Sequence, residues 1–416
     1  MPMRDACMPS TLGCWAMRNL LRAGFGPLAA FLCLMCIAFS ATAAPRIGVM
    51  TMQPGDIFWE RFGHDAIVVD DPAIGEPISY NFGFFDLEEP GFVGRFVRGE
   101  MEYALVALPL SQDLQLYRDE GRGVSVQWLD LTPEQAQSLA DQLAENARPE
   151  NARYRYDYFR DNCATRVRDA IDRAMGGSLG QQLASRSLGN SYRSEATRLS
   201  RPAPWMWLGF QFGLGPNADR ALSRWEEAFI PMRLADSLRE ARNVAGTPLV
   251  IREEVILPHR LAAEPLARAQ PVIAWTLIGL VFAIALWMAG RRKPKAVAGV
   301  ALVFWLVCGL LGVLMLYLWL GTAHWAAWRN HNLLLVSPLA WLLVPGAWAL
   351  LRGRSPSAFW RWALIVVTGL AALALPLSWV GVDAQSNTMW IGLLLPIHVA
   401  LAALWVRLRT HGSIDG

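Results

Sequence analysis

A cysteine at the start of a predicted helix is the strongest candidate for chemistry in this 416-residue sequence. Cys163 directly follows Asp161-Asn162. It is the first residue of a predicted helix, residues 163–175, in which apolar side chains recur at helical spacing. The first turn of such a helix carries unpaired backbone N–H groups, which stabilise a thiolate and lower the pKa of a thiol. The same groups can bind the oxyanion of a tetrahedral intermediate. The sequence therefore predicts that Cys163 is a nucleophile.

A nucleophilic thiol needs a general base, and His64 is the candidate. Residues 45–268 contain two histidines, and the other one, His259, lies close to the predicted membrane boundary. His64 begins a β-branched run, residues 64–69, that predicts a strand. A strand histidine that faces a cysteine at a helix start is the arrangement of papain-like thiol enzymes.

A third polar side chain is needed to orient the imidazole. Asn81, on the next predicted strand, is the candidate for that role. Asp65 and Asp86 are weaker alternatives, and Asp65 should point to the opposite face of the sheet from His64. The residue types also allow a simpler interpretation, in which Cys163 is a small buried hydrophobic residue and His64 an ordinary core or surface histidine.

Six further polar residues are predicted to contact a substrate. Two lie beside the cysteine, and four lie in a predicted outward-facing loop, where they would meet a phosphate or glycerol headgroup. They are Asn162, Arg166, His324, Arg329, Asn330 and Asn332. The spacing of His324 and His331 is not that of a helical metal pair, and no acidic residue is nearby, so we expect neither a metal site nor a cofactor.

Strands and helices alternate irregularly in the part of the chain that carries Cys163. A helix is predicted from Thr132, whose Pro133 and Gln135 form a typical start signal, to about residue 147. The helix at 163–175 ends at Gly176-Gly177. The predicted strands are residues 64–69, 78–82, 103–108 and 124–129. We therefore expect an α+β domain, an antiparallel sheet with packed helices.

The second half of the sequence has the composition of a membrane domain. Residues 269–416 hold ten basic and two acidic residues. Five apolar stretches there are each close to the length needed to cross about 30 Å of hydrocarbon. They are residues 272–289, 297–320, 333–351, 362–380 and 390–406. The sequence therefore predicts an all-α transmembrane bundle of five helices.

Residues 1–44 resemble a cleavable signal peptide. They combine arginines, a short apolar run and an Ala-x-Ala site, with cleavage expected after Ala43 or Ala44; an uncleaved anchor helix is the alternative. Residues 45–268 would then form an exported domain and 269–416 the membrane domain. The basic residues of the short loops fall mostly on one side. We expect a multi-pass protein of the bacterial inner membrane, with its first domain in the periplasm and its C-terminus in the cytoplasm.

The charge distribution and the number of cysteines exclude some classes of function. The formal net charge of +3 averages a mildly acidic exported part and a basic membrane part, and neither is typical of nucleic-acid binding. Cys163 is the one cysteine of residues 45–268, and Cys308 lies within an apolar stretch. An unpaired thiol in a compartment that favours disulfides is a candidate for reactivity.

Several sequence blocks resemble one family. Residues 58–66, 80–86 and 161–166, which contain Gly63-His64, Tyr80-Asn81 and Asn162-Cys163, resemble the exported domain of the Lnb-like family, formerly a DUF4105-type domain of unknown function. Residues 92–108 fit the same pattern, and residues 324–325, 330–334 and 337–339 resemble the membrane region of that family. The order of histidine before cysteine also resembles the circularly permuted NlpC/P60-like group of papain-like folds, which includes lecithin:retinol acyltransferase.

The resemblance implies a permuted papain-like fold and an acyl group that passes through a cysteine thioester. It implies that Cys163 is the nucleophile and His64 the base. Lnb-like enzymes are associated with transfer of an acyl chain to the N-terminal amine of a lipoprotein, so the implied partner is a lipid or lipoprotein in the membrane.

Two other functions fit the same residues. The first is a cysteine peptidase or amidase that acts on a peptide or a cell-wall stem, with water as the acceptor. The second is a non-catalytic membrane scaffold. Five predicted spans favour a lipidic substrate, because one span would suffice to tether a protease.

Overall fold

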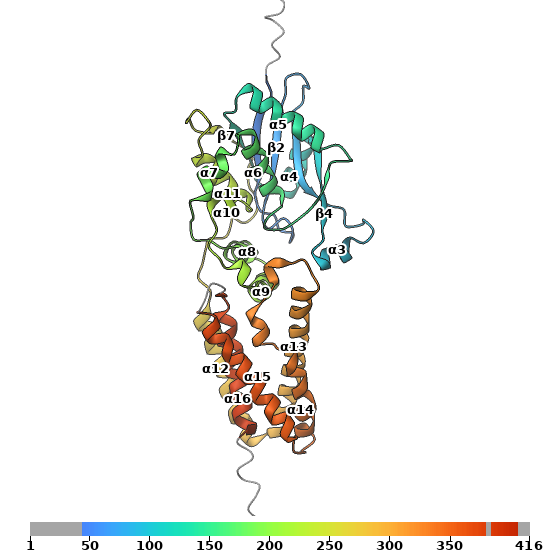
Figure 1. Cartoon of the computed structure of the whole chain (residues 1–416), viewed down its shortest axis with the longest axis vertical. Coiled ribbons are helices and arrows are strands. Elements are labelled where there is room, and N and C mark those ends of the chain that lie inside the picture. Colours follow the sequence, from blue (N-terminus) through green and yellow to red (C-terminus); the bar gives the residue numbers. More distant parts are fainter. Residues whose placement is uncertain (1–43, 380–383, 407–416) are drawn as a thin grey trace, which may run out of the picture.

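The computed structural model describes residues 44–379 and 384–406, and it has two parts. A domain built on a β-sheet lies at one end of an elongated molecule, and a bundle of long helices forms the other end (Figure 1). The last strand of the domain ends at Leu257, and the first long helix begins at Val272. The expected signal peptide, except for Ala44, lies outside the described residues.

Seven strands form one sheet in which every neighbouring pair is antiparallel. They are β1 (Arg46–Met52), β2 (His64–Asp70), β3 (Ile78–Phe84), β4 (Glu102–Pro109), β5 (Val124–Leu129), β6 (Arg153–Arg155) and β7 (Val250–Leu257). The order across the sheet is β6-β4-β3-β2-β1-β5-β7. All four predicted strands are therefore confirmed, and three more complete the sheet.

Helices cover both faces of this sheet. The domain contains α3 (Phe92–Arg98), α4 (Leu110–Glu120), α5 (Pro133–Asn146), α6 (Cys163–Ala174), α7 (Ser178–Ala184), α8 (Tyr192–Ser200), α9 (Pro204–Gly213), α10 (Arg224–Glu227) and α11 (Pro231–Glu240), with a 3-10 turn, η1 (Pro216–Ala218). The predicted capping box of Thr132 and Gln135 starts α5.

Alternation along the strands decides which side chain faces which helix. Ile67 and Val69 of β2 belong to the same core as Val167 and Ile171 of α6. The intervening Ala66 and Val68 pack with Tyr117 of α4 in a second core. Because both faces are buried, β2 is apolar at successive positions, and a polar side chain on it stands out.

The membrane part consists of α12 (Val272–Arg292), α13 (Pro294–Leu320), the short 3-10 turns η2 (Trp325–Ala327), η3 (His331–Leu334) and η4 (Pro338–Leu343), then α14 (Val344–Leu351), α15 (Ala358–Leu377) and α16 (Thr388–Val406). Five segments of the described chain are long and apolar enough to cross a membrane. The third is not one regular α-helix, because its first half forms 3-10 turns before α14 begins. An α+β domain followed by a five-span bundle agrees with the predicted fold class.

Candidate functional site

Asn162 fixes the start of α6 and with it the position of Cys163. Its side-chain oxygen accepts a bond of 2.9 Å from the backbone N–H of Thr165, and the Thr165 hydroxyl accepts from the Asn162 N–H at 2.7 Å. The amide nitrogen donates to the carbonyl oxygens of Tyr158 and Phe229 at 2.9 and 2.8 Å. Both ends of the buried amide are thus engaged within the protein. The arrangement gives Asn162 the role of a helix cap; its predicted contact with substrate stays a prediction.

Cys163 lies at the end of the sheet where β2 begins and β3 ends. A Cβ atom added to Gly83 would lie 3.8 Å from the Cβ of Cys163. The backbone N–H of Asp65 on β2 hydrogen-bonds to the thiol, and Cys163 packs in the core with Ile67 and Val69, on the face opposite to that of His64 and Asn81. Gly83 has a positive φ of 99° and no side chain, so it leaves room for the thiol beside the first residues of β2.

A chain of buried hydrogen bonds holds the imidazole of His64. Its Nε2 lies 3.0 Å from Oδ1 of Asn81. The amide nitrogen of Asn81 donates to Oδ2 of Asp113 at 2.8 Å and to the Ser79 hydroxyl at 3.2 Å. The Ser79 hydroxyl in turn donates to Oδ2 of Asp113 at 2.7 Å. Asn81 and Asp113 are both buried.

This chain determines which nitrogen of His64 can act as a base. Because the amide N–H groups of Asn81 point to Asp113 and Ser79, its oxygen must face the ring. The Nε2 of His64 then carries the proton that is donated to Asn81, and Nδ1 keeps its lone pair. Nδ1 is therefore the ring nitrogen that this network leaves as an acceptor, and the predicted contact of His64 with Asn81 is present.

Asp113 was missed by the sequence analysis. It lies on α4, where Leu110, Leu114 and Tyr117 pack against the core at helical spacing. An acidic residue on the apolar face of an amphipathic helix was the available signal, since a buried carboxylate needs polar partners. Asp113 contacts Asn81 and Ser79, so it orients the ring of His64 through Asn81.

Both members of the Cys–His pair are neutral at rest. Burial, reinforced by the guanidinium of Arg122, lowers the pKa of His64 to about 4, against the opposing influence of Asp113 and Asn81. Burial raises the pKa of Cys163 to about 12, and the nearby carboxyl of Asp65 adds to this. The direction is opposite to the sequence expectation, because desolvation of the thiolate outweighs the stabilising N–H groups of Asp65, Ala164 and Cys163. A standing thiolate does not fit this environment.

The two weaker candidates for the third residue have other roles. Asp65 is buried and accepts a bond of 2.7 Å from the Thr51 hydroxyl on β1, on the face opposite to that of Asn81, as its place in the strand predicted. Burial raises the pKa of Asp65 to about 7. Asp86 is exposed, and its side chain accepts from the backbone N–H of Glu88 in a turn. His259 lies where β7 ends and accepts a bond from the Gly123 N–H at 3.0 Å.

Arg166 lies one turn after Cys163 and is held from two sides. Its Nε and Nη2 donate to the two carboxylate oxygens of Asp161 at 2.5 and 2.8 Å. Its guanidinium carbon stands 3.9 Å from the ring centre of Tyr154. The predicted substrate contact of Arg166 stays a prediction, and such a contact would have to share the guanidinium with Asp161.

The four predicted loop residues lie where the domain meets the bundle, away from the Cys–His pair. The ring of His324 bonds to the carbonyl oxygen of Phe96 at 3.0 Å, and Arg329 donates to the side-chain oxygen of Asn217 at 3.0 Å. Asn330 donates to the carbonyl oxygens of Phe212, Gly213 and Leu214, and Asn332 donates to that of Phe212. Their predicted headgroup contact stays a prediction, while the structure uses them to fasten the two parts together.

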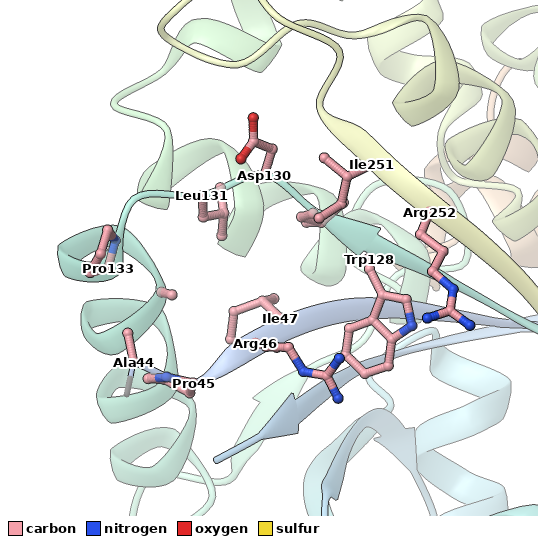
Figure 2. A pocket seen from close by; sticks show the side chains of 12 residues that line it. Ala44, Pro45, Arg46, Ile47, Trp128, Asp130, Leu131, Pro133, Ile251 and Arg252 are labelled. Carbon is pink, nitrogen blue, oxygen red and sulfur yellow. The ribbon is translucent and has the colours of Figure 1, made fainter. Parts of the chain in front are cut away.

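The domain also has a hollow remote from His64. This hollow of about 440 Å³ is lined by residues that include Arg46, Trp128, Asp130 and Ile251 (Figure 2). It lies by Arg46, at the end of β1 that pairs with Asp70, whereas Met52 at the other end pairs with His64. Among residues 44–379 and 384–406, no group of three or more His, Cys, Asp or Glu side chains could hold a metal ion.

Comparison with known families agrees with this two-part architecture. Residues 39–194 match the model of the Lnb N-terminal periplasmic domain, and residues 264–411 match that of the Lnb transmembrane domain. The first match includes the complete His64, Asn81, Asp113 and Cys163 set. No curated protein and no solved structure matches the chain significantly. The chain belongs to the Lnb-like family, with a periplasmic domain followed by a membrane domain in one polypeptide.

Proposed function

We propose that this protein is a membrane-anchored acyltransferase that uses Cys163 and His64 at the outer face of the inner membrane. The observation that carries the proposal is the bond chain from Asp113 through Asn81 to Nε2 of His64, which leaves Nδ1 as a base at the end of the sheet where Cys163 begins α6. The acyl donor is a lipid or lipoprotein ester, and the acceptor is an amine.

In the first half-reaction the Sγ of Cys163 attacks the ester carbonyl while His64 Nδ1 takes the thiol proton. The tetrahedral intermediate carries an oxyanion, which the N–H groups at the start of α6 stabilise. Collapse of the intermediate breaks the C–O bond, the leaving alcohol takes the proton from His64, and an acyl thioester remains on Cys163. A neutral thiol and a neutral imidazole suit this concerted transfer, because charge develops only with substrate present.

In the second half-reaction the acceptor amine attacks the thioester carbonyl. The amine gives a proton to His64, the C–S bond breaks, and the proton returns to the sulfur. The products are an amide and the free thiol, so the enzyme is restored without a cofactor. Water in place of the amine would make the protein a hydrolase, which is the outcome that the test must distinguish.

The way the domain is attached supports a lipidic substrate. Gln270, just before α12, donates to Gln211 of α9, and Asn330 and Asn332 bind the carbonyl oxygens at the end of the same helix. A protease on a tether would not need this many contacts with its anchor. A fixed orientation toward the membrane is useful when the substrate is embedded there.

The placement of basic residues supports the proposed topology. The α12–α13 and α14–α15 connections lie at the end of the bundle remote from the domain (Figure 1). The basic residues at or beside these connections include Arg291, Lys293, Lys295 and Arg352. Positively charged loops favour the cytoplasmic side. We place the domain in the periplasm and the C-terminus in the cytoplasm.

Mass spectrometry of the full chain in lipid nanodiscs tests the function. Incubation with diacyl phospholipid or a diacylated lipoprotein should add one acyl chain to Cys163, and a lipopeptide amine should remove it as an amide. The Cys163→Ala variant is the control and should gain no chain. Cleavage of a soluble peptide without any acyl adduct would replace this proposal with the peptidase alternative.

A further inference from the structure

Helix α3 is fixed to the membrane part although it belongs to the periplasmic domain. The backbone N–H of Ala323 donates to the carbonyl oxygen of Arg98 at 2.7 Å, beside the bond between His324 and Phe96. A Cβ atom on Gly99 would lie 3.0 Å from the backbone nitrogen of His324, so the two segments approach very closely. Since α13 ends at Leu320, α3 lies near the end of that span that faces the domain (Figure 1).

The exposed side chains of α3 are largely apolar. Val93 and Val97, one turn apart, are 69% and 45% exposed, and Phe96 is 36% exposed. Its arginines have partners on the domain, since Arg95 pairs with Glu89 and Arg98 with Glu100.

Exposed apolar residues also occur at the end of α13, to which α3 is joined. Tyr317 and Leu320 are both exposed there. Apolar surface that continues from a membrane span onto an adjoining short helix is typical of contact with the bilayer interface. Hydrocarbon of the outer leaflet is therefore the partner that fits this surface of α3.

Aromatic rings connect α3 to the cysteine. The ring centres of Phe96 and Tyr158 are 6.4 Å apart, and those of Tyr158 and Tyr156 are 5.6 Å apart. The ring of Tyr156 lies 3.5 Å from the point where a Gly83 Cβ would be, and the Cβ of Cys163 lies 3.8 Å from that point. The stretch from the exposed face of α3 to the thiol is thus lined with rings.

We propose that α3 rests its Val93 and Val97 side chains in the outer leaflet, and that Phe96, Tyr158 and Tyr156 guide an acyl chain from the bilayer to Cys163. A chain that stays in contact with apolar rings avoids the cost of exposing its methylene groups to water. The use of this route by a substrate rests on the proposed acyl transfer, whereas the contact of α3 with lipid does not.

Spin labels test the contact with lipid. In full-length protein whose native cysteines are replaced by serine, a label is placed at Val97→Cys or, as the control, at Val255→Cys on β7, and the protein is reconstituted in phosphatidylethanolamine–phosphatidylglycerol nanodiscs. The label at 97 should be quenched by oxygen more than by a water-soluble nickel chelate, and the label at 255 should show the reverse. Equal nickel access at both positions overturns the contact. Protection at 97 from both quenchers also overturns it, because another protein surface would then cover α3.

Alkylation of Cys163 tests the route without requiring acyl transfer. A long-chain N-alkyl maleimide dissolved in the bilayer should modify Cys163 about fivefold more slowly in a Val93→Ser/Val97→Ser variant, because the apolar entry is weakened. Water-soluble N-ethylmaleimide should react at an unchanged rate, and Ile251→Ser/Val255→Ser should slow neither reagent. Peptide mapping assigns the adducts to Cys163.

The outcomes separate the route from the proposed function. Equal slowing of both maleimides, or no slowing, overturns the route. Thioester formation on Cys163 from phospholipid at an unchanged rate in the α3 variant would leave acyl transfer standing while overturning the route. Absence of any thioester in the wild type, with the maleimide difference present, would instead overturn acyl transfer and leave the route standing.

Discussion

Two buried polar networks in this molecule use similar residues and end differently. In the site, Asp113 and Ser79 bind the amide of Asn81, whose oxygen holds one nitrogen of His64, and Nδ1 of the ring stays outside the network. The second network, the joint, consists of Asn330, Asn332, Gln385 and Asn387 with the C-terminal turn of α9. There the donors of the two asparagines end on main-chain carbonyl oxygens.

The difference shows what makes a polar side chain available for chemistry. In the joint, Gln385 donates to the side-chain oxygen of Asn330 at 2.9 Å, and Asn387 donates to that of Asn332 at 3.0 Å. Both amide groups of the two asparagines are thereby satisfied inside the protein. In the site, the network instead orients the ring of His64, whose Nδ1 keeps a lone pair outside the network. An asparagine amide is central to both networks, and the group at the end of each network is what differs.

The largest expected effect comes from removing the sulfur. Cys163→Ala and Cys163→Ser should lower acyl transfer by at least about a thousandfold, because the covalent intermediate cannot form. The joint does not include Cys163, so insertion and thermal unfolding should stay close to those of the wild type. Single-turnover assays beside unfolding curves measure both. Full activity in either variant would mean that Cys163 is a buried hydrophobic residue only.

The second-largest effect on the rate should come from substitution of Asp113, which accepts a hydrogen bond from Asn81. Asp113→Leu should lower the rate of thioester formation by about 10- to 100-fold, since a freely turning amide no longer fixes the tautomer of His64. Asp113→Asn keeps an acceptor for the Asn81 amide, so the rate of thioester formation should fall much less than in Asp113→Leu.

The pH dependence distinguishes positioning from simple structural damage. The charge of Asp113 raises the pKa of His64, so either substitution should lower that pKa further. The rate falls where His64 becomes protonated, and this acid limb should therefore move to lower pH in both variants. An unmoved acid limb with a slower rate at every pH would contradict the assignment.

A substitution in the joint should lower the stability of the protein and leave the reactivity of the Cys163 thiol unchanged. Asn332 is completely buried, and its loss removes one of two donors to the Phe212 carbonyl oxygen and strands the Asn387 amide. Asn332→Ala should lower the free energy of unfolding by about 1–3 kcal/mol. The rate of Cys163 alkylation by N-ethylmaleimide should not change in the folded protein. If alkylation instead slows while stability is retained, Asn332 belongs with the site and its predicted contact with a headgroup regains support.

The sequence was informative where the signal is local. Helical spacing placed Asn162 directly before its helix, and strand composition placed His64 and Asn81 in their strands, because these patterns extend over a few residues. The strand β7 was missed because its exposed edge carries Arg252, Glu253 and Glu254 instead of an apolar alternation. The joint was missed because Asn330 finds its acceptor at Leu214, 116 residues away, and nothing near either residue marks the pairing.

The smallest expected effect comes from removing the charge of Asp65, which lies on the same face of the sheet as Cys163. Burial raises the pKa of Asp65 to about 7, and the charged carboxylate in turn raises the pKa of Cys163. Asp65→Asn keeps an acceptor for the Thr51 hydroxyl and removes the charge. Alkylation of Cys163 should become about two- to fivefold faster at pH 8 to 9, where the wild type is charged, and should be unchanged below about pH 6, where Asp65 is already protonated.

Stability provides an independent readout of the same group. Because the pKa of Asp65 is higher in the folded state than the ordinary 3.8, folding takes up a proton between the two values. The wild type therefore loses stability as pH rises from about 4 to 7 through this residue, and the asparagine variant does not. Thermal unfolding should show Asp65→Asn to be more stable than the wild type at pH 8, with the gap closing toward pH 4. A gap that stays constant over this range would show that the carboxyl is already ionised at low pH, and the charge beside Cys163 would then be a permanent feature of the site.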